Sequence, residues 1–233
     1  MAPVGFVRYR EQVAQSGGAL SFRIPPSEAR PVPMKLAIRM GCIGAAVLSG
    51  RFSQGGVVTS SNAQMCGNKS DWWGFAGVRN ADGAIRELAG PGLERECSSL
   101  SCGADGERML PTTSRVTGAH KLPAQALIHT LAPASYTSPG SERSLFLTYE
   151  NVFRRADELS LPCLAVPALS CGVAGFPAAI GARAALDALE NASGGDEAVL
   201  TLVEFSLLDA RVYASFADAA HERWGRGGGA VRR

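Results

Sequence analysis

Apolar and polar positions follow two different periods along the chain, and each period predicts one kind of element. Alternating or short continuous apolar runs predict β-strands, whereas apolar positions that recur every three to four residues predict helices. The expected strands are 19–24, at an edge, followed by 34–40, 55–61, 113–117, 126–132, 162–170 and 197–205. The expected helices are 80–97 with an interruption at Gly90 and Pro91, then 141–159, 178–190 and 208–221.

The order of these elements indicates the fold class. Strands alternate with helices over the second half of the chain, which is typical of an α/β protein with parallel central strands covered on both faces. We therefore expect a three-layer α/β/α sandwich. Asp82 is expected to cap the first of these helices, and Ser141 or Ser144 the second.

The two ends of the chain differ from its middle. Residues 1–33 contain few periodic apolar positions and are interpreted as an N-terminal extension, with the domain itself over 34–222. Residues 223–233 are rich in Gly and Arg and have little to bury, which predicts a flexible tail.

Composition and charge narrow the possible partners. The chain has 233 residues, 46% of them hydrophobic, and a net charge of +2 without a dense basic stripe, so we expect a small-molecule partner rather than a nucleic acid. No apolar run is long enough to predict a membrane span. The six cysteines lack a paired framework, which favours reduced thiols and a location inside the cell, in the cytoplasm or nucleus. An organelle transit peptide in the basic N-terminal segment stays open.

The loop 170–177, "SCGVAGFP", follows an apolar run and precedes a helix. Gly172 and Gly175 allow close approach of the backbone to a ligand, and Pro177 suits the first turn of a helix. Backbone N–H groups in front of a helix suit an anion, above all a phosphate. The alternative is a tight connection that binds nothing.

Two further polar residues lie at predicted strand-to-helix transitions. Asn62 follows the strand 55–61, and its amide can both donate to and accept from hydroxyl groups. Asp82 lies at a helix start, where a carboxylate can cap the helix, orient a water or accept from a ribose hydroxyl. Three such loops together indicate a ligand site at the ends of the strands.

Four ordered motifs resemble the macro domain family, the ADP-ribose-binding module. They are "VTSSN", of which the last residue is Asn62, "DGAIRELAGPGLEREC", "TGAHKLPAQALIHTLAP" and "VPALSCGVAGFP". The similarity covers about residues 35–220. It implies a mixed sheet of six or seven strands between helices, with ADP-ribose in a cleft along the strand ends.

The resemblance also implies roles for individual residues. Asp82 and Asn62 are the expected catalytic residues, with Asp82 positioning a water and Asn62 contacting the distal ribose. Phe205 is expected to stack on adenine and Ile43 to line the site. The diphosphate is expected to be wrapped by Ser170, Cys171, Gly172, Val173, Ala174, Gly175 and Phe176.

The implied partner is ADP-ribose or a mono-ADP-ribosylated protein, with a nucleic acid only as a modified substrate and with no membrane. A monomer is expected, and neither a metal nor a cofactor is implied. The implied activity is removal of mono-ADP-ribose from modified substrates, and the alternative is a module that reads the modification without turnover.

Several positions depart from the family pattern. Cys42 replaces an acidic residue that reads adenine, and Ala174 replaces an aromatic residue. A longer segment, 66–80, which contains Trp72 and Trp73, replaces a glycine-rich run and could form a lid or a docking patch.

A different class of enzyme is also considered. Ser170 or Cys171 could be a nucleophile at a strand-to-helix turn, with His129 as a required base. His129 precedes both candidates, which is not the α/β-hydrolase order, and a core position on a strand is the simpler interpretation for it.

Overall fold

The computed structural model describes residues 18–28, 30–67, 80–192 and 198–225. Residues 226–233 of the predicted tail and residues 1–17 and 29 of the predicted N-terminal extension lie outside these residues, as do Trp72 and Trp73. The first two residues of the predicted tail, Arg223 and Trp224, instead end the last helix. The strands are β1 (Leu20–Ile24), β2 (Met34–Met40), β3 (Gly56–Ser60), β4 (Ser114–Gly118), β5 (Ala126–Thr130), β6 (Cys163–Val166) and β7 (Leu202–Leu207). The helices are α2 (Ile43–Leu48), α3 (Ala81–Ala89), α4 (Pro91–Ser99), α5 (Ser141–Glu158), α6 (Ala178–Glu190) and α7 (Ala210–Trp224).

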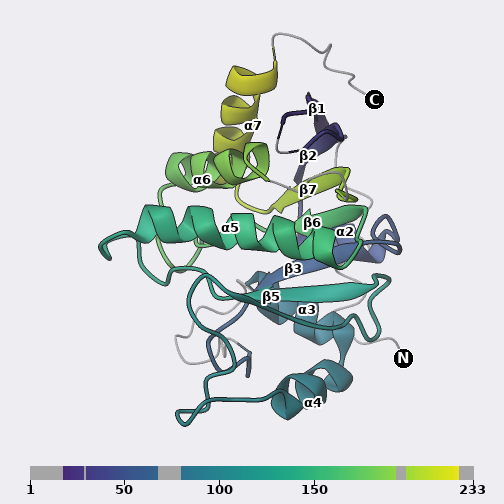
Figure 1. Ribbon diagram of the computed structural model, residues 1–233, viewed down its shortest axis with the longest axis vertical. Coiled ribbons are helices and arrows are strands. Elements are labelled where there is room, and N and C mark those ends of the chain that lie inside the picture. The colour runs from purple at the N-terminus through teal and green to yellow at the C-terminus, as the bar shows by residue number, and fades with distance from the viewer. Residues whose placement is uncertain (1–17, 29, 68–79, 193–197, 226–233) are drawn as a thin grey trace.

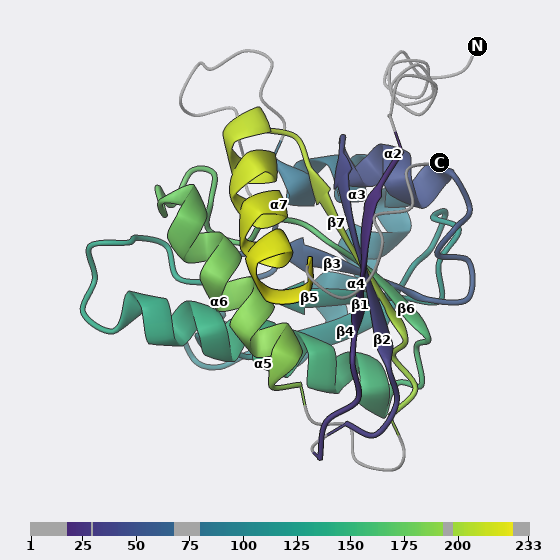
Figure 2. The same cartoon turned by 90° about the horizontal axis from the view of Figure 1, so that it is seen from above.

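The seven strands form one mixed sheet in the order β1-β2-β7-β6-β3-β5-β4. The five inner strands are parallel to one another, and the two edge strands, β1 and β4, are antiparallel to their neighbours. Helices α5, α6 and α7 cover one face, and α2 and α3 lie on the other (Figures 1 and 2). The predicted three-layer α/β/α sandwich with a centrally parallel sheet is confirmed.

Each face of the sheet has its own apolar core. The larger core lies under α5, α6 and α7 and includes Phe153, Phe205 and Phe216, which are fully buried. The smaller core lies under α2, α3 and α4 and includes Phe52 and Leu127. Strands β3, β5 and β6 are buried on both faces and begin as continuous apolar runs. Strands β2 and β7 instead carry polar residues at alternate positions, among them Arg39, Glu204 and Ser206.

The local patterns predict most element boundaries and miss some details. The interruption at Gly90 and Pro91 separates α3 from α4, as expected. Helix α5 is preceded by Gly140 in a left-handed conformation, and neither predicted serine makes a capping bond there. The short α2 was not predicted, because six residues are too few to reveal a helical period.

The described part of the predicted N-terminal extension is held tightly. β1 pairs with β2, which confirms the expected edge strand. Arg30, 4% exposed, forms an ion pair with Asp157 and donates to the carbonyl of Leu200 at 2.7 Å. The Asp157 carboxylate in turn accepts from the backbone of Val199 and Leu200 at 2.8 Å. This clamp joins the segment after β1 to α5 and to the segment before β7.

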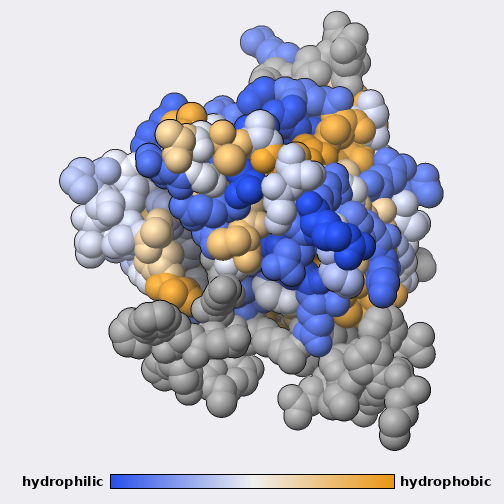
Figure 3. Space-filling model, turned by 90° about the horizontal axis from the view of Figure 1, so that it is seen from below, coloured by the Kyte–Doolittle hydropathy of each residue, from blue (hydrophilic) through white to orange (hydrophobic). Residues whose placement is uncertain are grey.

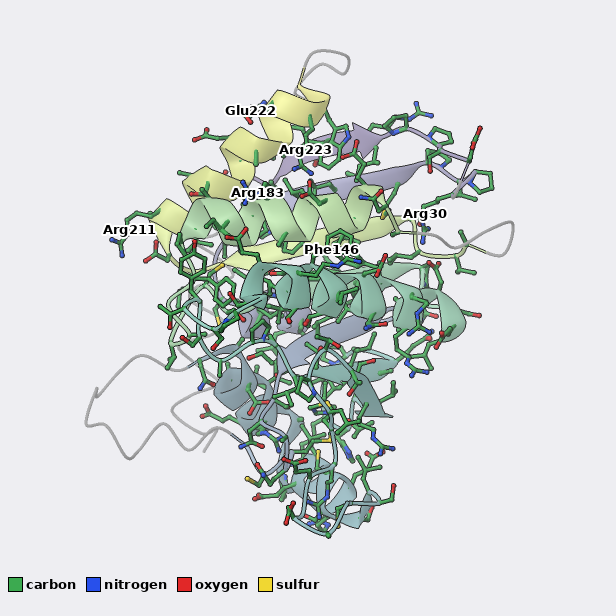
Figure 4. All side chains as sticks on the ribbon, turned by 60° about the vertical axis from the view of Figure 1, so that its left-hand side comes forward. Arg30, Phe146, Arg183, Arg211, Glu222 and Arg223 are labelled. Carbon is green, nitrogen blue, oxygen red and sulfur yellow. The ribbon has the colours of Figure 1, made fainter. Side chains whose placement is uncertain are left out.

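Ion pairs also join the outer helices. Arg183 on α6 binds Glu142 on α5 at 2.9 Å, and Arg223 on α7 binds Asp187 on α6 at 2.5 Å (Figure 4). Where the described residues can be seen in Figure 3, polar side chains predominate and apolar ones lie in small separate groups. No helix among the described residues is both long and apolar enough to cross a membrane.

Candidate functional site

The candidate site lies at the edge of the sheet where the five parallel strands end. Their last residues are Met40, Ser60, Thr130, Val166 and Leu207. Because parallel strands end on the same side, the segments that follow them come together at this edge. In spatial order these are the segments after β2, β7, β6, β3 and β5. The three loops singled out in the sequence therefore share one edge.

The loop after β6 is held in a defined conformation by contacts at both ends. Ser170 has a φ of +60°, an uncommon left-handed conformation for a residue with a side chain, and its hydroxyl donates to the carbonyl of Pro133 at 2.8 Å. The Phe176 amide donates to Ser170 at 3.2 Å, and the Gly175 amide to Gly172 at 3.0 Å. The loop is thus tied both to itself and to the segment after β5.

Three consecutive backbone amides at the tip of this loop are available to a ligand. Among the described residues, no acceptor is found for the N–H groups of Gly172, Val173 and Ala174. Val173 is 99% exposed, so this tip is open. Helix α6 begins directly after the loop and places its positive end behind it. Successive free amides in front of a helix form a concave site for a phosphate.

Tyr149 fixes the start of this loop from below. Its ring is fully buried on α5, and its hydroxyl accepts from the Leu169 amide at 2.7 Å. Tyr149→Phe leaves that amide without a partner, so we expect the free energy of unfolding to fall by about 1–3 kcal/mol. Urea denaturation measures the change, with Tyr213→Phe at a half-buried position of α7 as the matched control. Equal losses for the two variants would contradict this role.

The contacts of Ser170 and Cys171 argue against a nucleophile. The Ser170 hydroxyl donates to a backbone carbonyl, and no contact joins it to His129. Burial raises the pKa of the Cys171 thiol to about 12, so the thiolate is scarce near neutral pH. The thiol packs against Gly181 of α6, where a built Cβ would lie only 2.1 Å from the sulfur. Cys171 is therefore a packing residue.

Asn62 holds a turn together. Its side-chain amide donates to the carbonyl of Gly67 at 2.8 Å and accepts from the Cys66 amide at 3.2 Å. The Met65 amide donates to the Asn62 carbonyl at 3.0 Å. Both ends of the amide are thus occupied by residues 62–67, which we call the Asn62 turn.

Asp82 is buried, and its carboxylate has several partners. Its Oδ1 accepts from Thr59 at 3.0 Å and from Ser61 at 3.2 Å, while Oδ2 pairs with Arg86 Nε at 2.9 Å. The predicted N-cap role is wrong: Asn80 caps α3 by accepting from the Gly83 amide at 2.7 Å. Asp82 instead lies in the first turn and joins α3 to the end of β3.

His129 continues this network across the sheet. It is fully buried, with Nδ1 3.2 Å from Ser61 Oγ and Nε2 2.9 Å from Thr117 Oγ1. Burial, and then the nearby charge of Arg86, lower the pKa of His129 to about 4. The imidazole is therefore neutral at neutral pH.

The pKa of His129 makes stability depend on pH. The unfolded chain binds a proton near pH 6.5, whereas the folded chain does so only near pH 4. The stability that the neutral His129 gives the folded state is therefore complete above about pH 6.5 and is lost as the pH falls toward 4. By pH 5 the free energy of unfolding has fallen by about 2 kcal/mol through this group. Urea denaturation of wild type and His129→Asn between about pH 7.5 and 5 measures it. A variant that retains the wild-type pH dependence would contradict it.

The structure does not bring Phe205 or Ile43 to the surface of this edge. The Phe205 ring is fully buried between Tyr149 and Phe216, with centroids 6.1 and 4.9 Å away. Ile43 is 3% exposed and belongs to the smaller core. The apolar side chain exposed where β7 ends is Leu208, at 60%. The carbonyl of the preceding residue, Leu207, accepts from the Gly41 amide at 2.8 Å. Leu208 therefore lies beside the segment after β2, which contains the half-buried Cys42.

Sequence reasoning also missed the residues that support the site. Arg86 lies four positions after Asp82, a spacing that brings two side chains together on a helix, so its pairing could have been found. Thr59 on β3 and Ser61 just after it bind Asp82 from more than twenty residues away along the chain, and no local pattern reveals such a contact.

Comparison with known proteins places these features in one family. The family model described as Macro domain matches residues 73–185. A macro domain-containing protein of Streptomyces coelicolor, SCO6450, is 31% identical over 167 residues, which are 72% of this chain and 90% of the relative. A macro domain-containing protein of Streptomyces griseus is 34% identical over 147 residues, 61% of this chain and 78% of the relative.

Solved structures share the fold. The Oceanobacillus iheyensis macrodomain with ADP superposes with a TM-score of 0.68 at 23% identity, covering 86% of this chain and 94% of that one. The Trypanosoma brucei macrodomain in complex with ADP-ribose gives a TM-score of 0.63 at 22% identity, with 85% and 73% covered.

Proposed function

Since this chain belongs to the macro domain family, we propose that it binds ADP-ribose, free or attached to a protein, at the edge where its parallel strands end. The observation that carries the proposal is the row of free amides at Gly172, Val173 and Ala174 in front of α6. A diphosphate supplies the acceptors that these donors lack, and the helix dipole favours its negative charge.

The order of the loops along the edge supports an extended ligand. The exposed Leu208 follows β7, the amide-rich loop follows β6, and the Asn62 turn follows β3. From β7 to β3 there are two interstrand spacings, about 10 Å in total. An adenine at the apolar end, a diphosphate at the central loop and a second ribose near the Asn62 turn fit this order. Several modest contacts of this kind lead us to expect a Kd in the micromolar range.

Removal of mono-ADP-ribose is the second candidate activity, with Asp82 and Asn62 as the proposed catalytic residues. Hydrolysis needs a water held within hydrogen-bond reach of a base. Asp82 is 1% exposed and accepts from three side chains, and both ends of the Asn62 amide bind the Asn62 turn. These contacts favour a module that reads the modification.

The experiment separates binding from turnover. Calorimetric titration with ADP-ribose comes first, with ADP and ribose 5-phosphate as partial ligands. Incubation with a mono-ADP-ribosylated protein follows, with release of ADP-ribose as the readout. Binding without release would assign a reader, and release that is lost in Asp82→Asn while binding persists would assign a hydrolase. Absence of any heat with ADP-ribose would exclude the proposed function.

A further inference from the structure

A continuous network of side-chain contacts connects β4 and β5 to the Asn62 turn of the candidate site. It begins at Thr117 on β4, passes through His129 on β5 and Ser61 after β3, and reaches Asp82 and Arg86 on α3. Thr117, His129, Ser61 and Asp82 are each at most 6% exposed. This network reaches the Asn62 turn, because Arg86 Nη2 donates to the carbonyl of Met65 at 2.9 Å.

The contacts at the centre of this network favour one of the two neutral tautomers of His129. The Ser61 hydroxyl has one hydrogen and lies 3.2 Å from both Asp82 Oδ1 and His129 Nδ1, and a charged carboxylate is the stronger acceptor, so Ser61 donates to Asp82. The contact between Ser61 Oγ and His129 Nδ1 then requires Nδ1–H as the donor. In the neutral ring Nε2 is then the acceptor, and the Thr117 hydroxyl donates to it at 2.9 Å rather than to the Gly118 carbonyl at 3.3 Å. The other tautomer would use the Gly118 contact but would give up the hydrogen bond from Ser61 to the Asp82 carboxylate.

Charged groups of both signs surround the ring. Asp82 and Arg86 of α3 and Glu96 of α4 act on it electrostatically, and Arg115 of β4 lies opposite it in the strand register. Its partner strand on the other side contributes Thr59, which also donates to Asp82. The imidazole therefore links Thr117 on β4 to Ser61, and through Ser61 to the charged pair on α3.

We propose that His129 is a positioning residue for the ligand site, acting as a neutral Nδ1–H donor that orients the Ser61 hydroxyl toward Asp82. Asp82 then holds Arg86, and Arg86 supports the Asn62 turn through Met65 and through the packing of its side chain on Gly67. The effect on ligand binding rests on the proposed function, whereas the proton arrangement and the support of the turn do not.

The proton arrangement has a direct spectroscopic test. The nitrogen chemical shifts of the imidazole ring distinguish the two neutral tautomers of histidine. The protein has three histidines, so the ring signals that disappear in His129→Asn are those of His129. We expect the Nδ1–H tautomer near neutral pH. An Nε2–H tautomer would overturn the proposal.

Variants test the positioning role. His129→Asn places an amide N–H near Nδ1 and is expected to retain ADP-ribose affinity, whereas His129→Leu is expected to weaken it about tenfold, the factor that corresponds to one lost hydrogen bond. Leu127→Ala is the control, because Leu127 is fully buried on the same strand and belongs to the core on the same face but not to the polar network. Equal weakening by His129→Leu and Leu127→Ala, or no rescue by asparagine, would overturn the proposal.

Hydrogen exchange separates this inference from the proposed function. The Cys66 amide donates to Asn62 Oδ1, so its exchange reports on the Asn62 turn without any ligand. We expect faster exchange in His129→Leu and wild-type exchange in His129→Asn. If the wild type does not bind ADP-ribose, only the proposed function is excluded. The exchange of the Cys66 amide then still tests whether His129 supports the Asn62 turn. Unchanged exchange in His129→Leu would overturn it.

Discussion

Gly172→Glu is expected to weaken ADP-ribose binding by about a hundredfold or more. The substitution places a carboxylate beside the amides of Gly172, Val173 and Ala174, where a diphosphate is proposed to bind. Repulsion between like charges and loss of access to the amides both weaken binding. A hundredfold weaker Kd corresponds to a loss of about 2–3 kcal/mol in binding free energy, which is about the strength of one charge-assisted hydrogen bond.

The structure indicates that this variant folds. A Cβ built on Gly172 has nothing within 4 Å, and Gly172 lacks the positive φ that Gly175 has at +70°. Gly172→Gln has nearly the same size without the charge, so the difference between the two variants measures the electrostatic part. Calorimetric titration gives both affinities, and denaturation confirms equal stability. Wild-type affinity in Gly172→Glu would exclude this loop as the diphosphate site.

Asp82→Ala is expected to lower the free energy of unfolding by about 3–5 kcal/mol, because it leaves a mostly buried arginine without its counter-charge. Arg86 is 15% exposed in its side chain and Asp82 0%. The hydroxyls of Thr59 and Ser61 lose their acceptor in the same step. Urea denaturation measures the change.

Asp82→Asn is the matched control, since it retains an acceptor oxygen for the two hydroxyls and replaces the oxygen that pairs with Arg86 by an uncharged NH2 group. We expect a smaller loss than for alanine. This pair also matters for function, because loss of turnover in Asp82→Ala alone would not separate catalysis from unfolding. A stability of Asp82→Ala within about 0.5 kcal/mol of the wild type, the range of ordinary surface changes, would contradict the buried network.

The sequence by itself determined the parts of this protein that depend on local pattern. Runs of apolar residues predicted the strands, and Gly90 with Pro91 predicted the break between α3 and α4. The ordered motifs indicated the family, and the glycines after β6 indicated a loop open to an anion. Each of these signals is contained within a few neighbouring residues, where backbone conformation and side-chain period act directly.

The tertiary structure decided which face each residue occupies and which partners it meets. The last strand was predicted over 197–205 but lies at Leu202–Leu207, so the chain reaches the edge at Leu208 and Phe205 stays in the core. Apolar and polar residues alternate over Val203–Leu207, but all five are buried, so the alternation does not reveal which residue becomes exposed at the end of the strand. The partners of Asp82 and His129 come from other strands and a helix. Such contacts depend on strand register and helix packing, which join residues far apart in the sequence and leave no local trace.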